Sequence, residues 1–150
     1  MPSDAILAAV KDLSEKSGLD FSVTETVVEG TELYVVYATN HPFPDVYTVA
    51  AGVLGFRVPH NFPDAQPEDS FFIQPDTVKL KTADQKRNSV DIHRAAPDQN
   101  LLKGTPLGSG PALLFSWHIW NKVAWKRGKH TLADHYFHCV KRFEQPEHDI

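Results

Sequence analysis

The chain has 150 residues, of which 41% are hydrophobic, and a formal net charge of −4 at pH 7. This length and composition predict one globular domain, which buries roughly two thirds of its unfolded surface. No apolar run reaches the ~18 residues of a membrane span, no signal-peptide pattern is present, and the single cysteine excludes an intramolecular disulfide, so we expect a soluble cytoplasmic protein.

Charge is distributed unevenly along the chain. Residues 1–78 include twelve acidic and three basic residues, whereas residues 79–150 include twelve basic and seven acidic ones. The basic excess is either a solvated surface or a means of steering an acidic partner. A pI near 6.0 and the lack of a nucleic-acid-binding motif favour a protein partner over a nucleic acid.

Residues 4–17 are predicted to form an amphipathic helix. Ser3 precedes the helix as a suitable N-cap, and Gly18 follows it as a suitable stop. The apolar residues of this segment recur at helical spacing and share one face: Ile6, Val10 and Leu13.

Two strands of a hairpin are predicted next. From Phe21 apolar and polar residues alternate, and the Glu29-Gly30 turn leads to a second strand over 33–38. A loop is expected over 41–45, because this segment contains two prolines, which cannot donate to a strand ladder.

The third and fourth strands are predicted over 47–58 and 71–73. Gly52 and Gly55 in the third strand indicate a bulge or a close approach of another backbone. Because no helix separates the four strands, they favour an antiparallel meander over a parallel sheet.

The C-terminal half combines an irregular segment with a second helix. Residues 82–111 are polar and show no period. The last helix is predicted to begin near Thr131, where Asp134 completes a capping box. Its apolar stripe requires a sheet face, for which we expect Val35, Tyr37, Val49 and Val53. The stripe consists of Leu132, Tyr136, Cys139, Val140 and Phe143.

The predicted fold class is therefore α+β: an N-terminal helix, a four-stranded antiparallel meander and a C-terminal helix. Two segments also resemble motifs of a known family. The run from Val53 to Pro67, with Phe62-Pro63, is similar to the third strand and Tyr-Pro loop of ubiquitin-conjugating (E2) enzymes. Ser116-Trp-His, followed by Trp-Lys-Arg-Gly at 125–128, resembles the Ser-x-His and Trp-x-x-Gly pattern of the prokaryotic E2-like family E.

This resemblance covers residues 1–145 and implies a single E2-like (UBC) domain acting in a bacterial ubiquitin-like conjugation pathway, with antiphage defence as one setting. The implied partners are an E1-like adenylating enzyme, a ubiquitin-like modifier protein, and a JAB-type or other deconjugating peptidase. Three functions stay open. The chain accepts the modifier from the E1-like enzyme and passes it to a target, or it is a catalytically silent E2 variant that binds the modifier or the E1-like enzyme. The third alternative, which comes from the residues and not from the resemblance, is a metal-dependent hydrolase that uses the histidine-rich C-terminal region.

The candidate catalytic residues are Ser116 and His118. A standard E2 enzyme has its catalytic cysteine in this neighbourhood, after a His-Pro-Asn motif that is missing here. A serine hydroxyl with a nearby imidazole base can form an oxyester instead. The candidate binding residues are Trp117, His93, Asn100, Phe62 and Pro63, of which His93 and Asn100 are possible counterparts of the missing motif.

Cys139 is a further candidate nucleophile, because it is the only thiol and thiolates are good acyl carriers. Its place on the apolar stripe instead predicts a buried, structural cysteine.

Histidine and carboxylate side chains also recur along the last helix. His130, Asp134 and His138 are spaced four residues apart, with His135 beside them, which is compatible with zinc ligation. No HExxH motif is present, so a solvated polar face is favoured, and we expect no metal and no cofactor. Trp125 is predicted to be structural, because it precedes the helix in the family pattern.

Overall fold

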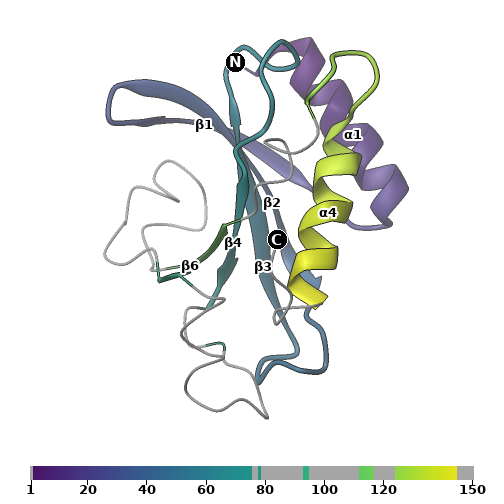
Figure 1. Ribbon diagram of the computed structural model, residues 1–150, viewed down its shortest axis with the longest axis vertical. Helices are drawn as coiled ribbons and strands as arrows, with labels where there is room; N and C mark the ends of the chain where they lie inside the picture. The colour runs from purple at the N-terminus through teal and green to yellow at the C-terminus, as the bar shows by residue number, and fades with distance from the viewer. Residues whose placement is uncertain (1, 76–77, 79–92, 95–111, 117–123, 145–150) are drawn as a thin grey trace.

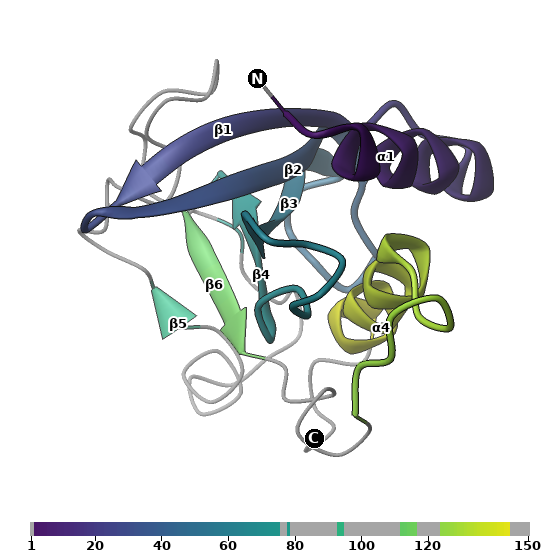
Figure 2. The same cartoon turned by 90° about the horizontal axis from the view of Figure 1, so that it is seen from above.

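The computed structural model describes residues 2–75, 78, 93–94, 112–116 and 124–144. Within these residues six strands form one antiparallel sheet in the order β1-β2-β3-β4-β6-β5, and two helices lie on one side of it (Figures 1 and 2). The predicted α+β class, with a helix at each end and an antiparallel meander between them, is confirmed.

Helix α1 (Asp4–Ser17) has the bounds and caps expected from the sequence. The Ser3 hydroxyl accepts a hydrogen bond from the amide of Ile6 at 3.3 Å, which satisfies one of the free amides of the first turn. Gly18 ends the helix in the left-handed conformation, with φ of 74°. The predicted apolar face, consisting of Ile6, Val10 and Leu13, is buried.

Strands β1 (Ser22–Val28) and β2 (Thr31–Pro42) form the predicted hairpin. Glu29 and Gly30 both have positive φ, 51° and 80°, as a two-residue type I′ turn requires. The prediction of a loop over 41–45 is wrong for its first two residues, because β2 continues through a register shift after Ala38 and Pro42 pairs with Ala51. After the shift β2 pairs with β3 again, and a proline is tolerated at the last position of a strand.

Strand β3 (Ala51–Pro59) begins four residues later than predicted, because Tyr47 lies in a turn whose amide donates to the carbonyl of Pro44. The close approach expected at its glycines is confirmed. A Cβ atom on Gly55 would lie 2.6 Å from Phe72 Cζ on the neighbouring strand β4 (Ser70–Gln74). Gly52 meets the carbonyl oxygen of Gln74 in the same way.

The sheet is wider than the four strands predicted. Strand β6 (Leu113–Ser116) pairs with β4 and extends the meander to five strands, and the short β5 (His93–Arg94) pairs with β6. Both lie in parts of the sequence with no clear strand period, and β5 has only two residues, too few for a period to be recognised.

Helices α1 and α4 (Leu132–Glu144) lie side by side on one face of the sheet (Figures 1 and 2). The predicted stripe of α4 is buried there against one core that includes Tyr34, Val36, Leu54, Phe56, Phe71 and Phe115. The prediction that Val35, Tyr37 and Val53 supply this face is wrong, since they form a separate cluster with Phe72. Of the four residues proposed, Val49 alone packs against the helix-side core.

The start of α4 carries the predicted capping box. Thr131 donates its backbone amide to Asp134 Oδ2 at 2.8 Å, and the amide of Asp134 donates to Thr131 Oγ1 at 3.2 Å. Neither this helix nor any other helix in the described ranges is long and apolar enough to cross a membrane.

Candidate functional site

The predicted site around Ser116 is described only in part. Ser116 is the last residue of β6 and pairs with Ser70 of β4, while His93 pairs with Leu114 of β6, so the backbones of Ser116 and His93 lie on adjacent strands, close to one another. Trp117, His118 and Asn100 lie outside the described residues. The roles assigned to these five residues stay predictions.

The other two candidate binding residues belong to a structural cluster with Trp125. Phe62 is buried, its ring centroid 5.9 Å from that of Trp125, and the indole of Trp125 donates to the carbonyl of Pro63 at 3.0 Å. Next to this contact, Arg127 forms an ion pair with Asp64 at 2.6 Å. The two segments that resemble E2 motifs thus meet in space, and the structural role predicted for Trp125 is confirmed.

Cys139 lies in the interior of the core, with 0% of its surface exposed. Burial raises the pKa of its thiol well above the ordinary value, with a smaller contribution from Asp69. A thiol that is both inaccessible and protonated cannot attack an acyl group. The predicted buried position of Cys139 is confirmed.

Replacing Cys139 by alanine should therefore lower the free energy of unfolding by only about 1 kcal/mol, through lost packing. The folded wild-type protein should not react with an aromatic disulfide reagent such as Ellman's reagent, whereas the protein in urea should release one equivalent of the coloured thiolate. Rapid labelling of the folded protein would show that the thiol is accessible and would contradict the buried assignment.

His135 contacts Cys139 and is part of the core, although the sequence placed it beside a polar row. Its exposed fraction is 0%; its Nε2 lies 3.5 Å from Cys139 Sγ, and its ring meets that of Phe56 edge-on with centroids 4.8 Å apart. Burial, reinforced by the charge of His138, lowers the pKa of His135 to about 3. His135 is therefore neutral at physiological pH.

The histidines and Asp134 considered for zinc are engaged in local structure. His130 precedes the helix, and its Nδ1 accepts a hydrogen bond from the amide of Lys126 at 2.8 Å, while Asp134 caps the helix. Burial lowers the pKa of His138, against an opposing effect of Asp134. Across the described ranges, no group of three or more His, Cys, Asp or Glu residues is arranged to hold a metal ion.

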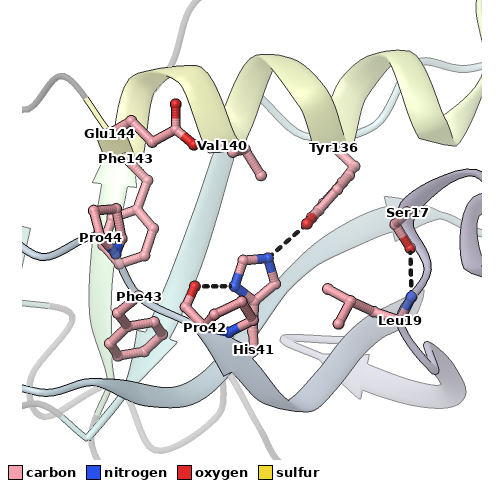
Figure 3. Close-up of a pocket in the computed structure, with 10 residues that line it drawn as sticks. All are labelled: Ser17, Leu19, His41, Pro42, Phe43, Pro44, Tyr136, Val140, Phe143 and Glu144. Carbon is pink, nitrogen blue, oxygen red and sulfur yellow. Dashed lines mark hydrogen bonds between the residues drawn. The ribbon is translucent and has the colours of Figure 1, made fainter.

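A cavity of about 470 Å³ lies between the end of α1, the end of β2 and α4. Its walls are apolar, and two polar side chains, Ser17 and Glu144, stand at opposite ends (Figure 3). The apolar lining consists of Leu19, Pro42, Phe43, Pro44, Val140 and Phe143. The volume falls within the range of roughly 300–1,000 Å³ that is usual for small-molecule sites.

His41 and Tyr136 form a hydrogen-bonded pair in this cavity. Figure 3 shows Tyr136 extending from α4 towards His41 on β2, where Tyr136 Oη and His41 Nε2 are 2.6 Å apart. His41 Nδ1 lies 2.7 Å from the carbonyl oxygen of Pro42, which can only accept, so Nδ1 holds the ring proton. Nε2 is then unprotonated and accepts the hydroxyl proton of Tyr136.

Both members of the pair are neutral at physiological pH. Burial lowers the pKa of His41, against a smaller opposing effect of its bond to Pro42. Burial also raises the pKa of Tyr136 to about 12, with contributions from Cys139 and Glu144. The pair therefore holds a polar oxygen at a defined place in an apolar cavity, rather than a ready nucleophile.

The sequence analysis missed this cavity. His41 was assigned to a loop and Tyr136 to an apolar stripe, and 95 residues separate the two. No local pattern links residues so far apart, since their hydrogen bond exists only after β2 and α4 have packed. Comparisons of this chain with protein-family models, curated proteins and solved structures give no match.

Proposed function

We propose that this chain is an E2-like scaffold in a ubiquitin-like conjugation pathway, which binds the modifier or its E1-like enzyme without carrying the modifier as a thioester. The observation that carries this choice is the burial of Cys139, the only thiol in the sequence. A thioester requires an accessible thiolate, and this thiol is enclosed between the sheet and α4.

The contact between the two E2-like motif segments supports the proposal. Phe62 and Pro63 lie in the loop after β3, and Trp125 precedes α4, yet their rings and backbone meet directly. The order of elements, with a helix before an antiparallel meander and another after it, is also the order expected of the UBC fold. The pathway partners follow from the resemblance: an E1-like enzyme, a modifier, and a deconjugating peptidase.

A second candidate function is transfer through an oxyester on Ser116. Ser116 ends β6 at the point where the resembled family has its reactive residue, and the backbone of His93 lies on the neighbouring strand. In this mechanism the Ser116 hydroxyl attacks the carbonyl carbon of the modifier's C-terminal acyl-adenylate. A histidine imidazole takes the hydroxyl proton, the bond to the phosphate breaks, and AMP leaves.

The test is incubation of the purified chain with ATP, its cognate E1-like enzyme and the ubiquitin-like modifier. The scaffold function predicts a stable complex in size-exclusion chromatography, with no covalent adduct on denaturing gels. Cys139→Ala should form the same complex, because the thiol takes no part in it.

Two outcomes would contradict the scaffold function. A thiol-sensitive adduct that disappears in Cys139→Ala would show that Cys139 is the nucleophile after all. A thiol-resistant, hydroxylamine-sensitive adduct that disappears in Ser116→Ala, and is weakened in His118→Ala, would establish the oxyester mechanism. In each case the variant must remain folded under the assay conditions, as judged by its circular dichroism spectrum, for the loss of the adduct to be chemical.

A further inference from the structure

We infer that the cavity between α1, β2 and α4 binds an organic ammonium ion with an apolar body. This inference goes beyond the proposed function and does not depend on it. It rests on three properties of the cavity: its apolar walls, polar side chains whose remaining hydrogen-bonding capacity is to accept, and negative charge at both ends.

The walls suit the apolar body of such a ligand. Six apolar residues line the cavity, and the rings of Phe43 and Phe143 stand in edge-to-face contact, with centroids 5.1 Å apart. Burial of an apolar ligand surface against such walls is favourable. The rings of Phe43 and Phe143 are largely buried, so they contribute apolar surface to the walls rather than open ring faces.

The polar atoms in the cavity are arranged to accept hydrogen bonds. Because Tyr136 gives its proton to His41, and His41 gives its own to Pro42, the lone pairs of the Tyr136 oxygen are left to accept from a ligand. Ser17 Oγ donates to the carbonyl of Ser14 at 3.4 Å and accepts from the amide of Leu19 at 3.2 Å, so its remaining capacity is also to accept (Figure 3). Glu144 can only accept when it is ionised. A ligand donor, such as an ammonium group, finds partners here, whereas a carboxylate does not.

The electrostatic environment of the cavity is negative, which also favours a cationic ligand. Both α1 and α4 end at the cavity, with Ser17 and Glu144 among its lining residues, and helix C-termini carry partial negative charge. Glu144 contributes to the raised pKa of Tyr136, after burial and Cys139, so its charge acts on the phenol oxygen. None of the ten residues that line the cavity is Lys or Arg.

Three basic residues lie in the last turns of these helices, and none of them lines the cavity: Lys16, Lys141 and Arg142. Lys141 is exposed. Lys16 forms an ion pair with Asp12 at 3.2 Å. The guanidinium of Arg142 lies over the ring of Phe115 at 6.0 Å. Their charges therefore do not supply an anion site in the cavity.

The experiment compares three probes that share a phenylalkyl body: 2-phenylethylamine, 2-phenylethanol and 3-phenylpropanoate. Binding is followed at neutral pH by NMR, through the ring resonances of His41 and Tyr136. Because the cavity is negative and its polar side chains accept hydrogen bonds, we expect the amine to bind about tenfold more tightly than the carboxylate, with the alcohol between them. Nα-acetyl-lysine methylamide, which keeps the ε-ammonium group of a lysine side chain, is added as a fourth probe. Tighter binding of this probe than of 2-phenylethylamine would identify a lysine side chain of a protein as the natural ligand, and the reverse order would identify a free amine.

Glu144→Gln is the informative variant, because Glu144 is exposed and its replacement keeps the side-chain shape. Affinity for the amine should fall about two- to fivefold, as expected for loss of a partly exposed ion pair, while affinity for the alcohol stays the same. Glu29→Gln, at the exposed turn between β1 and β2, is the matched control and should change neither value. Equal binding of amine and carboxylate, or no effect of any probe on the His41 and Tyr136 resonances, would overturn the inference.

Discussion

Replacing Phe143 by alanine should lower the free energy of unfolding by about 3–5 kcal/mol, the usual cost of removing a large buried aromatic side chain. Phe143 is 1% exposed and lies at the centre of an aromatic cluster. Its ring stacks on that of Tyr47 with centroids 4.6 Å apart, and it meets Phe43, Phe71 and Phe115 edge-on at 5.1–5.9 Å. These rings come from the β2–β3 loop, β4, β6 and α4, so the loss should affect the whole domain.

The measurement is urea denaturation of the wild type and the variant, followed by circular dichroism. Phe137→Ala is the matched control, because Phe137 is on the same helix but 48% exposed, and its loss should cost less than about 1 kcal/mol. A similar loss of stability in the two variants would mean that the aromatic cluster does not hold α4 on the sheet.

The second large effect is a loss of stability in mild acid caused by His135. In the folded protein the pKa of His135 is lowered to about 3, first by burial and then by His138, from an ordinary value of 6.5. Below pH 6.5 the unfolded chain therefore binds a proton that the folded protein rejects, and the free energy of unfolding falls with pH until the folded pKa is reached. Between pH 7 and pH 5 this should cost roughly 2 kcal/mol.

His135→Leu should remove this part of the pH dependence. Between pH 7 and pH 5, the free energy of unfolding of this variant should fall by roughly 2 kcal/mol less than that of the wild type. Phe56→Leu is the control, because it removes the ring that contacts His135 without removing the imidazole, and it should lower stability by a similar amount at both pH values. Equal slopes in the wild type and His135→Leu would show that His135 does not cause the acid sensitivity.

The sequence by itself determined those features whose free energy comes from neighbouring residues. The Ser3 cap and Gly18 stop of α1, the Glu29-Gly30 turn and the Thr131–Asp134 capping box each involve residues within a few positions of one another. Such hydrogen bonds and backbone preferences act before any distant contact forms, so a local pattern is sufficient to predict them.

The helix-facing side of the sheet was decided only by the tertiary structure. Residues 33–38 are all buried, and alternation along an entirely apolar run cannot tell one face from the other. Packing of α4 selected Tyr34 and Val36 for the helix side and left Val35 and Tyr37 on the opposite face. The width of the sheet also depended on distant pairing, because a strand as short as β5 exists only through its contact with β6.

The cavity depended on tertiary structure for the same reason. The sequence identified Cys139 as a buried residue, since its helical spacing with Leu132 and Phe143 is a local pattern. It contained no indication that His41 and Tyr136 would meet, or that His135 would be enclosed. These environments are created when α4 packs on residues that are distant in the sequence, such as His41 and Phe56. Burial then set the protonation of these side chains, and burial is a property of the packed domain rather than of any segment.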